Sequence, residues 1–264
     1  MDRSILFENL QNFRDLGGMT GADGRKIKPG MIIRGGNLHG ASEKDIEKLS
    51  EMLDLIVDFR TEGEIAEQPD PEIPGVEYWH LPVLATLTEG VSREKEADKN
   101  SFQKFMMDPQ GAEDYMKKTY AHMAVSEFAL SQQKLLLERL LNPGRKAVLF
   151  HCTAGKDRTG GFASIFEAIL GVDKDDILED YLLTNEASKE NIDRMIAHIT
   201  GRPGLDKERV IPALQAMFGA RESYFNAFME EAERVYGSLD GFMEKALGIG
   251  EEEKNRFRKL YLEP

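Results

Sequence analysis

The only cysteine of the chain, Cys152, stands in a segment whose residue types and spacing could bind an anion and attack it. Residues 151–160 read H-C-T-A-G-K-D-R-T-G, with Arg158 six positions after Cys152 and Gly155 between them. If this segment curls around a phosphate group, its main-chain N–H groups can bind the oxygens, and Arg158 can add a planar, two-pronged contact. Gly155 permits the backbone angles that such curvature needs. The segment therefore predicts a phosphate-binding loop with a thiol at its base.

The neighbouring residues decide whether Cys152 is a nucleophile or a small core side chain. An apolar strand is predicted at 147–150 and a helix after the loop, so the loop would lie at a helix N-terminus that favours an anion. A thiol in that position, beside Arg or Lys, ionises far more readily than an ordinary thiol. An isolated cysteine is more often buried in a core. The longer string H-C-x-x-G-x-x-R-T-G, with its strand and helix, favours the nucleophile.

The order of the expected elements indicates an α/β fold with a helical C-terminal part. Besides the strand at 147–150, apolar runs predict strands at 31–34, 55–59 and 76–81. Helices are expected over residues 42–52, 112–124, 128–141, 162–170, 175–200, 207–218, 221–236, 240–247 and 251–261. Residues 86–100 are polar and charged, which predicts a loop. We expect a single domain over residues 1–264, with the helices of residues 190–264 at its C-terminal end and partly covering the site.

Composition narrows the classes of partner and cofactor. The 264 residues carry a net charge of −13, which disfavours nucleic acid and anionic lipid but leaves room for an anionic substrate in a locally positive pocket. One cysteine excludes an intrachain disulfide and a Cys-rich zinc site, and the five histidines show no metal spacing, so neither a metal nor a cofactor is predicted. The chain has no apolar run of membrane-spanning length and no leader-like start. We therefore expect a cytoplasmic protein without stable membrane association.

The loop resembles that of the bacterial cysteine-based tyrosine and dual-specificity phosphatases, which reads H-C-x-x-G-K-D-R-T-G. Three further segments are similar to motifs of that family: residues 12–18 (N-F-R-D-L-G-G), 33–38 (I-R-G-G-N-L) and 57–64 (V-D-F-R-T-E-G-E). Gly35 departs from the pattern, because the family usually has serine there. The resemblance spans nearly the whole chain and implies a cysteine-phosphatase-like fold, in which a central, mostly parallel sheet is flanked by helices.

The resemblance also implies a two-step hydrolysis of phosphate monoesters through a phosphocysteine at Cys152. Arg158 would stabilise the transition state, and the substrate would be bound by the loop residues Thr153, Ala154, Gly155, Lys156 and Thr159. The Thr159 hydroxyl could also donate to the sulfur when it leaves.

The general acid is not obvious from the sequence. The only tryptophan, Trp79, is not followed by the Pro-Asp pair that supplies the acid in larger tyrosine phosphatases. The resemblance suggests Asp157 instead, whose alternative role is a partner of a loop cation. Asp58 is the reserve candidate, although a strand-end carboxylate paired with Arg14 or Arg34 is its expected role. Supporting roles are expected for His151, which would orient the loop, for Arg60 as a buried structural arginine and for Arg14 as a brace.

The expected substrate is a phosphorylated protein, carrying phosphotyrosine and also phosphoserine or phosphothreonine, or a phosphoinositide. Lys156 is similar to the lysine of phosphoinositide phosphatases, but it could equally be a solvated loop lysine. Two alternatives stay open: a phosphatase for inositol phosphates or other small molecules, and a module that binds phosphate without turnover. The second is disfavoured, because binding alone needs no nucleophile.

Overall fold

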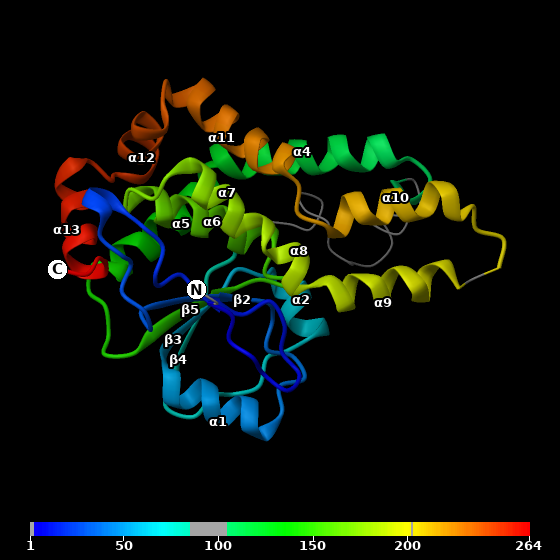
Figure 1. The fold of residues 1–264 in the computed structure, drawn as a ribbon, viewed down its shortest axis with the longest axis horizontal. Coiled ribbons are helices and arrows are strands. Elements are labelled where there is room, and N and C mark those ends of the chain that lie inside the picture. Colours follow the sequence, from blue (N-terminus) through cyan, green and yellow to red (C-terminus); the bar gives the residue numbers. More distant parts are fainter. Residues whose placement is uncertain (1–2, 85–104, 202) are drawn as a thin grey trace.

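A computed structural model describes residues 3–84, 105–201 and 203–264 (Figure 1). In this part of the chain one sheet is formed by β1 (Arg14–Asp15), β2 (Ile32–Gly35), β3 (Leu53–Asp58), β4 (Glu77–His80) and β5 (Ala147–His151). The strand order is β1-β2-β5-β3-β4, and every pair is parallel except β1 with β2. The predicted α/β class with a mostly parallel central sheet is confirmed. Because β5 is central, the loop after it emerges in the middle of the edge where the parallel strands end.

Helices flank the sheet and make up most of the C-terminal half. They are α1 (Glu43–Met52), α2 (Glu62–Glu67), α4 (Pro109–Val125), α5 (Glu127–Leu140), α6 (Asp157–Ile169), α7 (Lys174–Leu182), α8 (Thr184–Ala187), α9 (Lys189–Thr200), α10 (Lys207–Phe218), α11 (Glu222–Tyr236), α12 (Leu239–Leu247) and α13 (Glu251–Tyr261). The predicted loop at 86–100 lies outside the described residues.

The single helix predicted over 175–200 is wrong, because this segment forms α7, α8 and α9. Ile177 and Tyr181 of α7 are buried in the main core. In Figure 1, α9 instead leaves the body of the molecule beside α10. The chain must therefore change direction between the two, and its backbone leaves the helical angles at Ser188 (φ −107°, ψ 3°).

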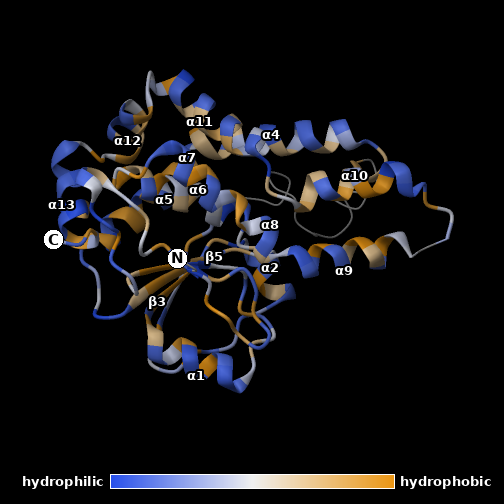
Figure 2. Cartoon of the chain, viewed as in Figure 1, coloured by the Kyte–Doolittle hydropathy of each residue, from blue (hydrophilic) through white to orange (hydrophobic). Residues whose placement is uncertain are grey.

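Alternate residues of β5 face the two sides of the sheet, as the pleat requires. Val148 and Phe150 join the larger core, which includes Phe162 of α6, whereas Ala147 and Leu149 join the smaller core that packs against α1. Figure 2 shows the central strands β3 and β5 as largely apolar segments between these layers. Cys152, directly after β5, continues the side of the larger core. By the same alternation, the preceding residue His151 points to the opposite side.

Helices α9, α10 and half of α4 extend beyond the sheet (Figure 1). Helix α10 contacts both α4 and α9, and α4 also contacts α11. Ala112, Ala216 and Met217 form a small core of their own between α4 and α10. Among the described residues, no helix combines the length and apolar character needed to cross a membrane.

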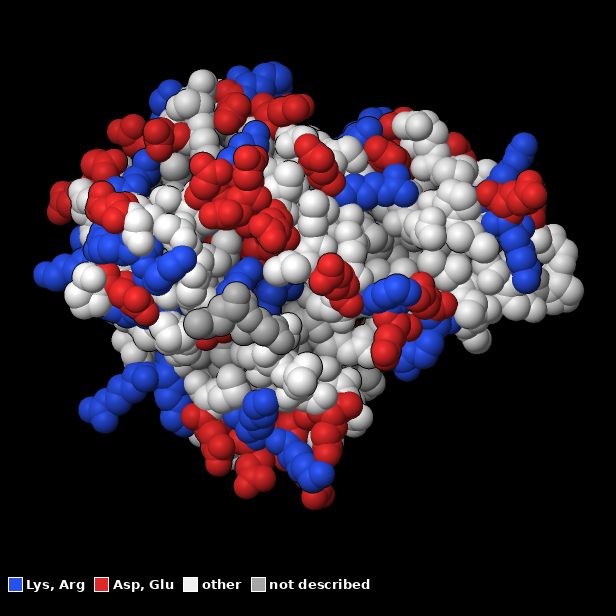
Figure 3. Space-filling model, viewed as in Figure 1, with Lys and Arg blue, Asp and Glu red and all other residues white. Residues whose placement is uncertain are grey.

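The negative net charge lies on the surface, whereas the cations of the signature loop are buried. In Figure 3, acidic side chains gather over α7. Its exposed acids, together with its N-cap, are Asp173, Asp175, Asp176 and Glu179. By contrast, Lys156 is 2% exposed and Arg158 is 8% exposed. Two cations of the loop are therefore shielded from the acidic surface, at the end of the sheet where an anion could be bound.

Candidate active site

The loop between β5 and α6 keeps its main-chain donors free. Among the described residues, no N–H group of residues 153–159 donates to a protein acceptor; the first backbone bond of α6 runs from Gly160 N to Lys156 O (2.8 Å). No side chain caps the helix. Unpaired N–H groups at the N-terminus of a helix form an anion-binding site, and the helix dipole adds to the attraction.

The carbonyl groups of this loop are bound from behind. Asn12 Nδ2 donates to the carbonyls of Ala154 (2.9 Å) and Gly155 (3.1 Å), and Arg34 NH2 also donates to Gly155 (3.2 Å). Asn37 donates to the carbonyl of Thr153 through both its main-chain N (3.2 Å) and its Nδ2 (3.0 Å). The carbonyls are thus bound by groups outside the loop, which fixes the loop while its N–H groups stay without a protein acceptor among the described residues.

Gly155 is required by this curvature. Its φ of +69° lies in the left-handed region, which costs other residues about 1–2 kcal/mol. A Cβ atom there would also come within 2.6 Å of the main chain of Gly35. The loop therefore lies directly against β2. The glycine at position 35, where the family usually has serine, leaves no room for a side chain either, since its Cβ would meet the ring of Phe13 at 2.4 Å.

Arg158 is held by a carboxylate from another helix. Its NH1 and NH2 atoms donate to Glu64 Oε2 (2.6 Å) and Oε1 (2.8 Å), and the Thr153 hydroxyl donates to Oε1 as well. Glu64 is fixed in turn by a capping box with Thr61 at the start of α2. Long second contacts run from NH1 to the Phe59 carbonyl and from NH2 to the Thr153 hydroxyl (both 3.4 Å). A guanidinium has five N–H donors, so among the described residues the Nε–H is left without an acceptor, and the two long contacts are the ones that an anion could replace. Glu64 thus holds Arg158 in position without using all of its protons.

The pairing of Arg158 with Glu64 dominates their electrostatics. Burial alone would raise the pKa of Glu64, but hydrogen bonds and charge from Arg158 lower it to about 2. Burial alone would lower the pKa of Arg158, but Glu64 raises it, with a further contribution from Cys152. Arg158 is therefore a fixed cation next to the thiol.

Cys152 at the start of the loop and Thr159 in the first turn of α6 are both buried. The thiol is free and 2% exposed, and Thr159 is fully buried. The Thr159 hydroxyl has no hydrogen-bond partner among the described residues. Its donation to the sulfur is thus not formed here and stays a prediction for the step in which the sulfur leaves.

Lys156 and Asp157 form an ion pair but differ in burial. Lys156 Nζ donates to the carbonyls of Met217 (2.6 Å) and Gly219 (3.2 Å) at the end of α10, so its ammonium group is not solvated. Asp157, the first residue of α6, is 27% exposed in its side chain and lies 3.3 Å from Lys156 Nζ. Its Oδ1 accepts from the Tyr120 hydroxyl (2.6 Å). Asp157 is therefore a carboxylate at the loop that solvent can reach.

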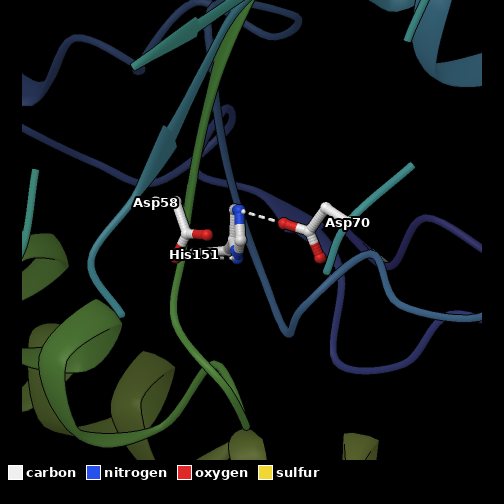
Figure 4. Close-up of side chains that lie close together, drawn as sticks. All are labelled: Asp58, Asp70 and His151. Atoms are coloured by element: carbon white, nitrogen blue, oxygen red, sulfur yellow. Dashed lines mark ion pairs between the residues drawn. The ribbon is translucent and has the colours of Figure 1, made fainter. Parts of the chain in front are cut away.

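On the other side of β5, His151 lies between two carboxylates (Figure 4). Its Nε2 is 3.2 Å from Asp70 Oδ2, and its Nδ1 is 3.9 Å from Asp58 Oδ1. Arg60 donates to both oxygens of Asp58 and lies 2.7 Å from Asp70, and Tyr78 donates to Asp58 (2.7 Å). The predicted pairing of Asp58 with Arg14 or Arg34 is wrong: its partner is Arg60, two residues along the chain.

These charges stabilise one another. Burial would raise the pKa of Asp58, but His151 and Arg60 lower it to about 2. Burial would lower the pKa of His151, but Asp58 and then Asp70 raise it. Asp58, Asp70 and His151 have a spacing that could hold a metal ion. However, Arg60 already occupies oxygens of both carboxylates and would repel a cation, so we interpret the group as a buried ion-pair network.

Arg14 and Arg34 meet Asp180 behind the loop. Arg14 Nε donates to Asp180 Oδ1 (3.1 Å), Arg34 NH1 donates to Oδ2 (2.7 Å), and Arg3 joins them at 2.7 Å. Arg14 also donates to Asn12 Oδ1 (2.8 Å), which orients the amide that holds the loop carbonyls. Burial, and then Arg34, lower the pKa of Arg14 to about 10. Arg14 thus acts on the loop through Asn12.

Several residues around the site are not predicted by the sequence. Asp70, Tyr120, Asp180 and Tyr181 stand in segments without a motif and reach the site only through the fold. Asn12 and Glu64 do stand in the motif-like segments 12–18 and 57–64. Those segments could have pointed to them, although not to their partners.

The comparisons with known proteins agree with this geometry. Residues 5–263 match the model of the tyrosine phosphatase family. The chain therefore belongs to that family.

Its curated relatives are similar over most of their length. A Cupriavidus necator protein that carries the name of a tyrosine-protein phosphatase is 33% identical, covering 93% of this chain and 84% of its own. The triple specificity protein phosphatase PtpB of Mycobacterium tuberculosis is 25% identical, covering 95% and 96%. A crystal structure of a P. aeruginosa TpbA variant in complex with pTyr shares 16% identity over 76% of this chain and 86% of its own. Its TM-score of 0.32 is too low to support a conclusion.

Proposed function

We propose that this protein hydrolyses phosphate monoesters, with phosphotyrosine as its main substrate, through a phosphocysteine at Cys152. One observation carries the proposal: the N–H groups of residues 153–159 have no protein acceptor among the described residues, and they belong to the same short segment as the thiol of Cys152 and the buried guanidinium of Arg158. Donors fixed in advance, where a phosphate gains charge, are a large source of catalysis.

The reaction has two steps. In the first, the Cys152 thiolate attacks phosphorus, the bond from phosphorus to the leaving oxygen breaks, and that oxygen takes a proton from Asp157. In the second, water attacks phosphorus, the Asp157 carboxylate accepts a proton from the water, and the S–P bond breaks to return the thiolate. Arg158 and the loop N–H groups bind the phosphate oxygens throughout.

The surroundings of the two candidate acids favour Asp157 over Asp58. Asp58 is fully buried, and both of its oxygens are engaged by Arg60. Asp157 is partly exposed at the start of α6, so it can exchange protons with solvent between turnovers. Its neighbour in sequence, Lys156, is a cation close enough to stabilise the carboxylate after it has given up its proton.

Phosphotyrosine is favoured as substrate by family membership. A relative named as a triple specificity phosphatase leaves phosphoserine, phosphothreonine and phosphoinositides to be tested. Lys156 adds no support for inositol phosphates, since its ammonium group binds two main-chain carbonyls.

Two measurements test the proposal: the rate of substrate hydrolysis and the trapping of the phosphocysteine. Wild type should hydrolyse 4-nitrophenyl phosphate and phosphotyrosine peptides, and Cys152→Ser should show no measurable turnover. Rapid denaturation during turnover of ³²P-labelled substrate should leave label on the wild-type chain and none on Cys152→Ser. Equal rates for the two proteins would refute the proposal. Phosphopeptide binding without turnover by wild type would favour the binding module instead, and competition with inositol phosphates and phosphoinositide vesicles would rank the substrate classes.

A further inference from the structure

Two buried tyrosines form a hydrogen-bonded chain that ends on Asp157. The Tyr120 hydroxyl lies 2.6 Å from Asp157 Oδ1 and 2.7 Å from the Tyr181 hydroxyl. Tyr120 belongs to α4 and Tyr181 to α7, and each is 1% exposed. Neither residue stands in a motif of the sequence, and neither has a part in the two steps described above.

The direction of the chain follows from the number of protons. A tyrosine hydroxyl has one proton, and an ionised carboxylate can only accept. Tyr120 therefore donates to Asp157, and the bond between the two tyrosines must be donated by Tyr181. Burial, and then the charge of Asp157, raise the pKa of Tyr120 far above its ordinary value, so its hydroxyl stays a donor at all physiological pH values.

Packing holds these hydroxyl groups in place. The rings of Tyr120 and Tyr181 meet edge to face at 6.1 Å, and the ring of Tyr224 lies 5.6 Å from that of Tyr120. On α6, a Cβ at Gly160 would come within 3.0 Å of the Tyr181 ring. The last glycine of the signature loop thus lets Tyr181 pack directly against the helix that carries Asp157.

We propose that Tyr120, supported by Tyr181, is a positioning residue for the proton transfer by Asp157. Because Oδ1 accepts the Tyr120 proton, the proton that Asp157 delivers is held on Oδ2. When the leaving oxygen takes that proton, Asp157 becomes a carboxylate and its bond from Tyr120 strengthens, because hydrogen bonds to ionised groups are the stronger ones. A hydrogen bond that is stronger in the transition state than in the ground state accelerates the proton transfer.

This inference rests on the proposed function, and leaving groups of different basicity separate the two. The parameter kcat/KM reports the first step. Tyr120→Phe should lower kcat/KM for phenyl phosphate, a poor leaving group, about tenfold, the effect of one charge-assisted hydrogen bond. For 4-nitrophenyl phosphate, which needs little protonation, the loss should stay below about threefold. Tyr181→Phe should give the same selectivity with a smaller loss, about threefold for phenyl phosphate.

Tyr224→Phe is the matched control. Its hydroxyl is in the same cluster but donates to the Ala216 carbonyl (2.7 Å), so its removal should not discriminate between the two substrates. In an Asp157→Asn background, Tyr120→Phe should have no further effect on phenyl phosphate.

Equal losses of kcat/KM for both substrates in Tyr120→Phe and Tyr181→Phe would overturn the inference, because a purely structural role predicts that result. The same selectivity in Tyr224→Phe would also overturn it. If Asp157→Asn itself shows no leaving-group dependence, Asp157 is not the acid and the inference fails, while hydrolysis through Cys152 stands. Absence of turnover by wild type is the separate result that refutes the proposed function.

Discussion

The two sides of the chain at the end of β5 differ in how their polar groups are paired. On the side of His151, Asp58, Arg60 and Asp70 neutralise one another, and Arg60 alone binds both carboxylates. On the side of Cys152, the N–H groups of residues 153–159 have no protein acceptor among the described residues. His151, the last residue of β5, thus lies in a buried group of charges that pair with one another, whereas Cys152, the residue after it, begins a loop whose N–H donors are unused.

The difference indicates which side serves the fold and which serves a ligand. Breaking a buried ion pair leaves an uncompensated charge and costs stability. Unused donors at a helix N-terminus instead attract an anion from outside. Both sides share β5, so the stable network supports the strand from which the binding loop starts.

The largest expected effect is on the stability of the fold, and it comes from a substitution on the side of His151. Asp58→Asn should lower the free energy of unfolding by about 3–5 kcal/mol, because Arg60 and His151 lose a buried counter-charge. Urea unfolding at pH 7 measures this loss of free energy. Asp240→Asn, which removes the 80% exposed partner of Lys254, should cost less than about 1 kcal/mol. Similar losses for both variants would mean that the network around His151 does not hold the fold.

The next largest effect is on the rate of turnover, and it comes from a substitution on the side of Cys152. Arg158→Lys should lower kcat about 10²–10³-fold, because one ammonium group cannot bind Glu64 and two phosphate oxygens together. The same exchange in the network, Arg60→Lys, should reduce stability but lower kcat less than tenfold. Steady-state kinetics with 4-nitrophenyl phosphate and urea unfolding of both variants test the contrast. Equal losses of kcat would break the distinction between the two sides.

A smaller effect is expected from the pairing of Glu64 with Arg158. Since the pKa of Glu64 is lowered to about 2, its contribution is complete above about pH 5 and is lost as the pH falls toward 2. Glu64→Gln should therefore be less stable than wild type by up to about 3 kcal/mol at pH 6. This difference should shrink by roughly half at pH 3.

Urea unfolding of Glu64→Gln at pH 6 and pH 3 measures this dependence. The exposed Glu62 of the same helix supplies the control, since Glu62→Gln should give no comparable pH-dependent difference. A gap between wild type and Glu64→Gln that does not change with pH would argue against the ion pair as the source of the stabilisation.

The sequence alone determined the parts of this protein that depend on neighbouring residues. Apolar runs predicted strands close to β2, β3, β4 and β5, and the helices after residue 207 were placed within a residue or so of their observed bounds. The contiguous segment 151–160 indicated the loop, its glycine and the Cys152–Arg158 spacing. Such features follow from backbone periodicity and local steric limits, which act over a few residues.

Only the tertiary structure decided which side chains surround that loop. Glu64 holds Arg158 across 94 positions, Tyr120 reaches Asp157 across 37, and Asp180 gathers Arg14 across 166. Sequence reasoning chose the wrong partner for Asp58 because several arginines were equally plausible by charge. Charge complementarity does not depend on position along the chain, so distant pairs are set by the strand order and helix packing that bring particular side chains within hydrogen-bond distance.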